Sequence, residues 1–203
     1  MGLEPDRYLL YVSRFEPENN PDRVVEAYAR VEGQRPLVMV GGAPYAARLI
    51  RRVRELADPR VLLPGPVYGD GYRQLLFNCR LYIHATEVGG THPALVEAMG
   101  AGRPVLYYDT PENREVAADA AAYFRAAEPA TLTAALARLL AAGESERTAL
   151  RRAAAERAAR LYSWDRVVDD YEALFHVPAR IKNISAEQLQ ATAAAVSRPI
   201  GSP

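Results

Sequence analysis

Short apolar runs alternate with amphipathic stretches along most of this chain. Four runs of strand length are apolar at nearly every position, as in strands buried on both faces of a sheet: 8–13, 37–40, 81–83 and 104–108. The runs 61–63 and 122–124 are shorter examples. Between these runs, apolar residues recur at helical spacing, which predicts helices after a cap at Asn20 or Asp22 and over about 45–56, 72–78, 93–100, 130–141 and 145–161, with a last helix from Ser163.

This alternation, with short connections, predicts an α/β domain with a doubly wound, mostly parallel sheet. Such sheets bind ligands beyond the carboxyl ends of their strands. Five polar or glycine-rich segments are expected at that edge: Arg14, Gly41-Gly42, Gly65, 84–91 and 109–115. Their convergence favours a ligand site over a set of ordinary loops.

The segment 84–103 has the pattern of an anion-binding turn. A strand leads into Gly89, Gly90 and Thr91, and a helix follows. Backbone N–H groups in such a turn approach an anion closely, and the helix N-terminus adds partial positive charge. Glu97, one helical turn deeper, could bind ribose hydroxyls, so a nucleotide is the suggested ligand. Alternatively, the turn is an ordinary connection and Glu97 is simply solvated.

Composition narrows the choice of partners and compartment. The chain has 25 basic and 25 acidic residues, so no basic surface indicates nucleic acid. A single cysteine, Cys79, excludes an internal disulfide framework and a cysteine-based zinc site. We found no signal-peptide pattern and no transmembrane segment, and we expect a soluble, cytoplasmic protein.

The predicted organisation is one main domain and a tail. Residues 6–176 form the Rossmann-like domain, whose last helix buries the apolar face Val167, Val168, Tyr171, Leu174 and Phe175 in the core. Residues 177–203 form the tail. Within it, 185–196 could be a docking helix, followed by a disordered end.

Five segments resemble, in this order, the C-terminal donor-nucleotide domain of a GT-B glycosyltransferase of group 1 type. They are SRFEPENN (13–20), VGGAPY (40–45), GPV (65–67), EVGGTHPALVEAM (87–99) and YSW (162–164). The resemblance covers roughly 6–176 and implies a Rossmann-like half of a GT-B fold. YDTPENRE (108–115), with the glycine turn, is similar to a rhamnosyltransferase-like subgroup.

The resemblance also assigns roles to individual residues. Arg14 sits where the family places the arginine that contacts the donor diphosphate, and it is the one expected catalytic residue. Asn19 stands where a lysine is common. Glu97 falls on the ribose-binding glutamate. Gly89 replaces a second glutamate that reads the donor sugar, and Glu87, two residues away, could compensate for it.

The remaining expected contacts lie on backbone and loops. Gly90 and Thr91 match the backbone donors at the pyrophosphate, and Val67 matches a loop that meets the base. His84 is expected to be structural and hydrogen-bonded, and His92 to be a helix cap. The segment 113–115 could either contact the donor or simply begin a helix.

The resemblance implies that a sugar, rhamnose or another hexose, passes from a nucleoside diphosphate sugar to a glycan or similar acceptor. The nucleotide sugar is a substrate, and neither a cofactor nor a metal is expected. The acceptor domain of such an enzyme would precede this segment, so the chain alone should be inactive; any peripheral membrane contact would come from that missing domain. The alternative is a stand-alone nucleotide-sugar-binding or partner-binding module.

Overall fold

Six parallel strands form one sheet in the computed structural model, which describes residues 2–125 and 129–176. The strands are β1 (Leu9–Val12), β2 (Leu37–Val40), β3 (Val61–Gly65), β4 (Leu81–His84), β5 (Val105–Tyr108) and β6 (Ala122–Phe124). Their order in the sheet is β3-β2-β1-β4-β5-β6, and every neighbouring pair is parallel. The predicted doubly wound α/β fold is confirmed.

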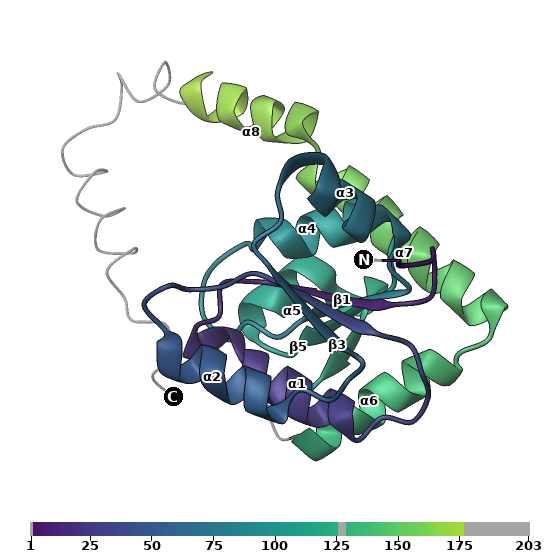
Figure 1. Ribbon diagram of the computed structural model, residues 1–203. Helices are drawn as coiled ribbons and strands as arrows, with labels where there is room; N and C mark the ends of the chain where they lie inside the picture. Colours follow the sequence, from purple (N-terminus) through teal and green to yellow (C-terminus); the bar gives the residue numbers. More distant parts are fainter. Residues whose placement is uncertain (1, 126–128, 177–203) are drawn as a thin grey trace, which may run out of the picture. The chain divides into compact units, whose positions relative to one another are not determined.

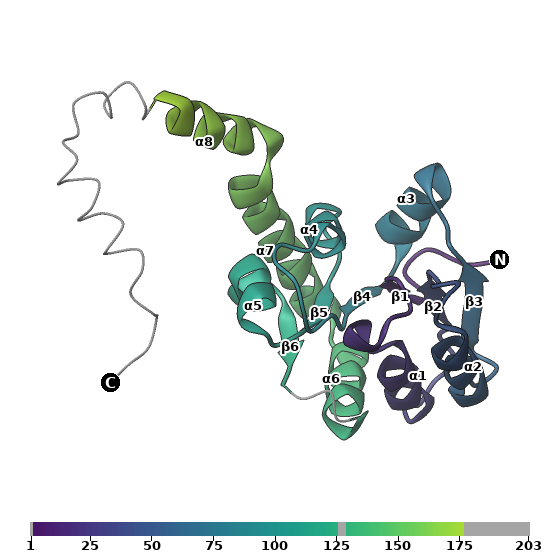
Figure 2. The same ribbon diagram turned by 90° about the vertical axis from the view of Figure 1, so that its left-hand side faces the viewer.

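Helices cover both faces of this sheet, as Figures 1 and 2 show. One face carries α1 (Pro21–Ala29), α2 (Ala47–Leu56) and α6 (Pro129–Ala141). The other carries α3 (Gly69–Asn78), α4 (Pro93–Gly100), α5 (Pro111–Ala117) and α7 (Glu144–Tyr162). Short 3-10 turns at Pro17–Asn19 and Ala118–Ala120 complete this part of the chain.

Strands β1, β2, β4 and β5 are buried at nearly every position because both of their faces are covered. Leu9 and Tyr11 point into the core shared with α1, α2 and α6, and both are almost fully buried. Their neighbours Tyr8 and Leu10 are equally buried but lie outside that cluster, as alternation along a strand requires. The Tyr8 hydroxyl donates to the Leu75 carbonyl of α3 at 2.7 Å. A continuous apolar run therefore indicates a strand that packs against helices on both faces of the sheet.

The last described helix, α8 (Trp164–His176), belongs to a separate unit. The chain divides between Leu161 and Tyr162, whereas the sequence predicts one domain to residue 176. Ser163 caps α8 as predicted, accepting from the Arg166 N–H at 3.2 Å. The expected docking helix at 185–196 lies outside the described residues.

Within its own unit, the apolar face of α8 is not covered: Val168, Tyr171, Leu174 and Phe175 are all more than half exposed, and Val167 is only partly buried. That this face is core stays a prediction. An amphipathic pattern shows that a helix has an apolar face, but it does not show what covers that face.

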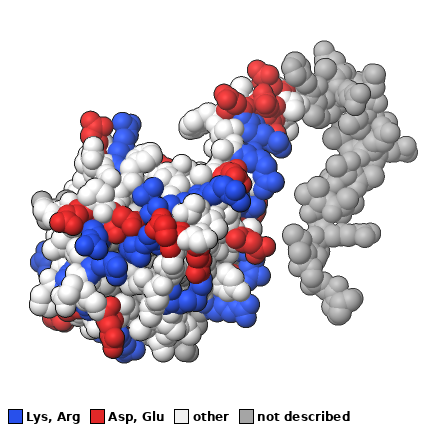
Figure 3. Space-filling view, turned by 90° about the vertical axis from the view of Figure 1, so that its right-hand side faces the viewer, with Lys and Arg blue, Asp and Glu red and all other residues white. Residues whose placement is uncertain are grey.

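Charges of both signs are interspersed on the molecular face in Figure 3, in keeping with their equal numbers in the sequence. A broad single-sign patch that would attract nucleic acid is not visible on that face. Among the described residues, no helix is both long enough and apolar enough to cross a membrane.

Candidate functional site

The sheet order reverses between β1 and β4, which lie side by side. Helix α1 follows β1 onto one face and α4 follows β4 onto the other (Figure 2). The loops after these strands therefore diverge and leave a crevice at the carboxyl edge of the sheet, where ligands bind in folds of this kind. A pocket of about 390 Å³ lies there. It is lined by the loops after β1, β2, β3 and β4 and by the first turn of α4.

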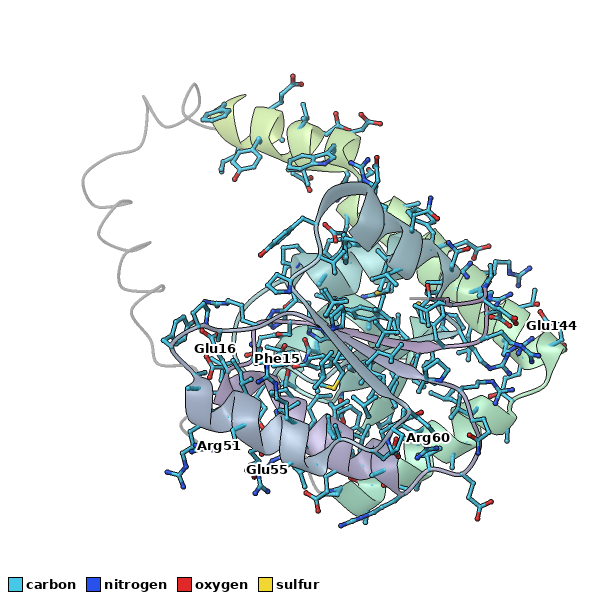
Figure 4. All side chains as sticks on the ribbon, in the orientation of Figure 1. Phe15, Glu16, Arg51, Glu55, Arg60 and Glu144 are labelled. Carbon is cyan, nitrogen blue, oxygen red and sulfur yellow. The ribbon has the colours of Figure 1, made fainter. Side chains whose placement is uncertain are left out.

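Arg14 supplies positive charge to this pocket. It comes shortly after β1, its side chain is 72% exposed, and its guanidinium lies 3.2 Å from Glu16 Oε1. The Tyr45 hydroxyl donates to the same carboxylate oxygen. Figure 4 labels Glu16 and Phe15 in this loop, near the start of α2. The Glu16 side chain is only 13% exposed, so solvent reaches this ion pair from the side of the guanidinium, and there Arg14 is accessible to a phosphate.

Asn19 lines the pocket, but its side chain already has protein partners. Its Nδ2 donates to the Arg14 carbonyl at 2.8 Å, and its Oδ1 accepts from the Thr86 hydroxyl at 2.9 Å. The Tyr11 hydroxyl donates to its backbone carbonyl at 2.7 Å. Asn19 thus joins the loop after β1 to the loop after β4. Its direct contact with a ligand remains a prediction.

Asn20 makes the second link between the same two loops. It occupies the N-cap position of α1, as predicted, in the left-handed conformation with φ 54°, but its side chain makes no capping bond. The side-chain amide instead donates to the Ala85 carbonyl at 2.8 Å and to Glu87 Oε1 at 2.9 Å. Glu87 does not line the pocket. Its carboxylate is committed to Asn20, so a donor-sugar contact by Glu87 stays a prediction.

The two glycines of the turn differ in the space around them: Gly90 borders open space, whereas Gly89 has no room for a side chain. Gly89 has φ +140°, and a Cβ placed there would lie 2.6 Å from Cε1 of His92. This contact gives a physical reason why the glutamate expected from the resemblance is missing. A Cβ at Gly90 would meet open space, and Thr91 is exposed. Pro93 and Ala94 in the first turn of α4 line the pocket. Pro93 has no N–H, and the Leu95 N–H donates to the His92 carbonyl at 3.1 Å, so the Ala94 N–H is the donor that this turn offers to the pocket.

Val67 and Glu97 lie on the α3 and α4 side of the pocket. Val67 lines it, and a Cβ added at the neighbouring Gly71 would lie 3.0 Å from Val67 Cγ1. Glu97 is exposed, lies one helical turn beyond Pro93 and does not line the pocket itself. The Tyr72 hydroxyl donates to Glu97 Oε2 at 2.5 Å. Sequence analysis missed Tyr72; its position five residues after Val67, at the start of a predicted helix, was the available signal.

His84 lines the pocket, although almost all of its side chain is buried, and its structural role stays a prediction. It is 4% exposed, and its ring centroid lies 4.9 Å from that of His92. Burial, assisted by His92 and opposed by Asn113, lowers the pKa of His84 from 6.5 to about 3. The imidazole is therefore neutral near pH 7, and its Nε2 has no hydrogen-bond partner among the described residues. His92 occupies the N-cap position of α4, but its side chain makes no capping bond.

The segment 113–115 lies within α5, which begins at Pro111, in line with one of its two interpretations; a donor contact stays a prediction. Thr110 caps α5 by accepting from the Asn113 N–H at 3.2 Å. The buried Asn113 side chain donates to the carbonyls of Thr86 and Tyr108 at 2.8 and 3.0 Å. Arg114 pairs with Asp109 at 2.6 Å. The bond from Asn113 to the Thr86 carbonyl ties the loop after β4 to α5.

An all-parallel α/β sheet with a ligand pocket at its switch point defines a Rossmann-like domain. The family model described as "Glycosyl transferases group 1" matches residues 2–157. The chain therefore belongs to the group 1 glycosyltransferases. A search of curated proteins finds no match.

Solved GT-B structures share this fold at low sequence identity. Sucrose-phosphate synthase from Thermosynechococcus elongatus has a TM-score of 0.75 and 20% identity, over 88% of this chain and 47% of that one. HepE from Anabaena, solved with UDP and glucose, has a TM-score of 0.70 and 18% identity, over 86% of this chain and 49% of that one. The catalytic domain of cholesterol-α-glucosyltransferase from Helicobacter pylori has a TM-score of 0.61 and 22% identity, over 75% of this chain and 98% of that one. This chain spans about half the length of the first two.

Proposed function

We propose that this chain is the donor-binding half of a glycosyltransferase and holds the nucleoside diphosphate of a sugar nucleotide in the switch-point pocket. The observation that carries the proposal is the convergence there of Arg14 with Val88 and His92, which flank the Gly89–Thr91 turn, and with Pro93 and Ala94 at the N-terminus of α4. A cation beside a glycine turn and a helix N-terminus suits a diphosphate. HepE, which shares the fold, was solved with UDP, which supports a nucleotide as the ligand.

The proposed nucleotide runs from this turn towards α3. The diphosphate lies between Arg14 and the first turn of α4, the ribose reaches Glu97, and the base lies near Val67. Support comes from the positions of these groups: Val67 lines the same pocket, and Glu97 follows one turn deeper on α4. Asn19 and Asn20 hold the loop that carries Arg14 against the turn.

The proposed chemistry is electrostatic. When a sugar leaves its donor, negative charge develops on the diphosphate, and Arg14 with the turn amides would stabilise that charge. No step of this scheme passes through a metal. Among the described residues, no group of three or more His, Cys, Asp or Glu side chains could hold one.

For the sugar and the acceptor, we propose only their chemical classes. The segment 108–115 motivates rhamnose or another hexose as the sugar, and a glycan as the acceptor. Gly89 removes the glutamate that would read sugar hydroxyls, so the acceptor-binding half is proposed to contribute more to sugar selection.

Calorimetric titration of the 203-residue chain with UDP, GDP and dTDP tests the nucleotide site. At least one should bind, and Glu97→Ala should weaken that binding by about 1–3 kcal/mol, the scale of a lost charged hydrogen bond. Arg14→Ala should weaken it by a similar amount and reduce its salt dependence.

Matched controls come from α2. Arg51→Ala and Glu55→Ala remove the same charges at positions that do not line the pocket and that Figure 4 shows on the outer side of that helix. Both should bind nucleotide like the unaltered chain. If no nucleoside diphosphate binds, or if all four variants bind alike, the proposed site is wrong.

A further inference from the structure

His92 is a titratable side chain without a partner in the pocket proposed to hold the diphosphate. It lines that pocket and occupies the N-cap position of α4, but its imidazole caps no N–H group. Within the described residues, its ring nitrogens make no hydrogen bond and no ion pair. The imidazole is therefore available to a ligand.

One edge of the His92 ring lies against the glycine turn. A Cβ built on Gly89 would lie 2.6 Å from Cε1 and 3.2 Å from Nε2 of His92. On the strand side, the ring contacts His84, with the two ring centroids 4.9 Å apart. An N–H at Nε2 is therefore placed to donate to an anion that binds at the turn.

The pocket offers little positive charge to such an anion. Among the described residues that line it, Arg14 is the only arginine or lysine, whereas Glu16 and Glu18 are both acidic. Arg14 already pairs with Glu16 at 3.2 Å. Asn19, which also lines the pocket, can donate hydrogen bonds but carries no charge. A bound diphosphate would therefore favour protonation of a nearby base.

His92 is the base placed to accept that proton. Burial, opposed by the Glu112 carboxylate, lowers the pKa of His92 from its ordinary value of 6.5, so the ring of the free chain is neutral near pH 7. An anion in contact with the ring favours the charged form. His84 is almost fully buried, with a pKa of about 3. The charged or titratable groups that face His92 or share its pocket are His84 of β4, Glu112 of α5, and Arg14, Glu16 and Glu18 of the segment after β1.

We propose that His92 takes up a proton from solvent when a nucleoside diphosphate binds, and that its imidazolium supplies the second positive charge of the site. The proton stays on the ring, which donates to a phosphate oxygen. When the sugar leaves, the same charge stabilises the diphosphate. The inference rests on the proposed function, because that function places the diphosphate at the Gly89–Thr91 turn. It goes further by naming a residue that contacts the leaving group and by making nucleotide binding depend on a proton.

Calorimetric titration of the 203-residue chain with UDP, GDP and dTDP counts the protons. The titrations are run in two buffers of different ionisation enthalpy at about pH 7.5, where a terminal phosphate with a pKa of about 6 is already ionised. We expect each nucleotide that binds to bring about half a proton onto the chain. Between about pH 6.5 and pH 8, the dissociation constant should rise about tenfold relative to that of His92→Asn.

The variants separate the charge of His92 from its place in the structure. Asparagine is a favoured N-cap residue, so His92→Asn should keep the start of α4 while losing the proton uptake. His92→Gln is a second neutral variant with the same expected result. His92→Lys is charged throughout this pH range, so it should bind without proton uptake and as tightly at about pH 8 as at about pH 6.5. Thermal melting checks that each variant folds.

The outcomes distinguish the role of His92 from the nucleotide site itself. If a nucleotide binds but the unaltered chain takes up no proton, this inference is overturned whether or not the variants fold, and the nucleotide site stands. The same holds if a folded His92→Asn or His92→Gln takes up as many protons as the unaltered chain. If none of the three nucleotides binds at either pH, the proposed function is overturned, and the role of His92 is overturned with it.

Discussion

His84 should make the stability of this protein depend on pH in a way that one substitution removes. Its pKa is lowered from 6.5 to about 3 because the ring is buried and lies against His92. Between about pH 6.5 and pH 3, His84 is therefore protonated in the unfolded chain but not in the folded chain. Stability is fully present above pH 6.5 and falls as the pH decreases through this window.

The size of the effect follows from the width of the window. Each pH unit below 6.5 removes about 1.4 kcal/mol for one fully shifted group. At about pH 5, the loss is therefore about 2 kcal/mol, a large part of the about 5–15 kcal/mol that stabilises a typical domain. Because His84 is 4% exposed, solvent screening should not reduce this figure much.

The assay is urea denaturation of the unaltered chain and of His84→Gln at about pH 7.5 and pH 5. Glutamine fills a similar space and does not titrate, so the carboxylates common to both chains cancel in the comparison. The unaltered chain should lose about 2 kcal/mol more than the variant. Parallel losses in the two chains would refute a neutral, buried His84.

Two further predictions concern glycines at the crevice. Gly41→Ala should lower the stability by about 3 kcal/mol or more, because φ is +140° and the new Cβ would lie 1.8 Å from the Ser13 carbonyl oxygen. Gly90→Ala, which meets open space, is its control in the same melting experiment. Gly89→Glu should weaken nucleotide binding and destabilise the turn by about 1–3 kcal/mol, since its Cβ meets His92. Replacing His92 by Gly in that variant should restore part of the loss; a Gly89→Glu chain that binds nucleotide more tightly would contradict this account.

The layered sheet was predictable because its signal is local. Strand β2 has the predicted bounds, 37–40, because its apolar run ends where burial ends, and β6 also has its predicted bounds, 122–124. Glycine and proline near strand ends marked the edge at which the pocket lies. These features depend on a few consecutive residues each.

The contacts that shape the pocket were not predictable from such local patterns. Asn20 was expected only as a helix cap, whereas its partner Ala85 lies 65 positions away. Tyr72 and Glu97 are 25 positions apart and meet only because α3 and α4 cover the same face. The apolar face of α8 is a similar case, because periodicity describes one helix and not the neighbour that covers it.

The two asparagines at the crevice have a mechanical consequence. Strands β1 and β4 are paired, and beyond their ends the Glu87 N–H donates to the Glu18 carbonyl at 2.8 Å. The Asn19 and Asn20 side chains add further links between the two loops, to Thr86, Ala85 and Glu87. Arg14 and the anion-binding turn must then move as one body. A ligand that draws in the turn would carry the guanidinium with it, and a substitution at Asn20 would loosen both at once without touching the ligand.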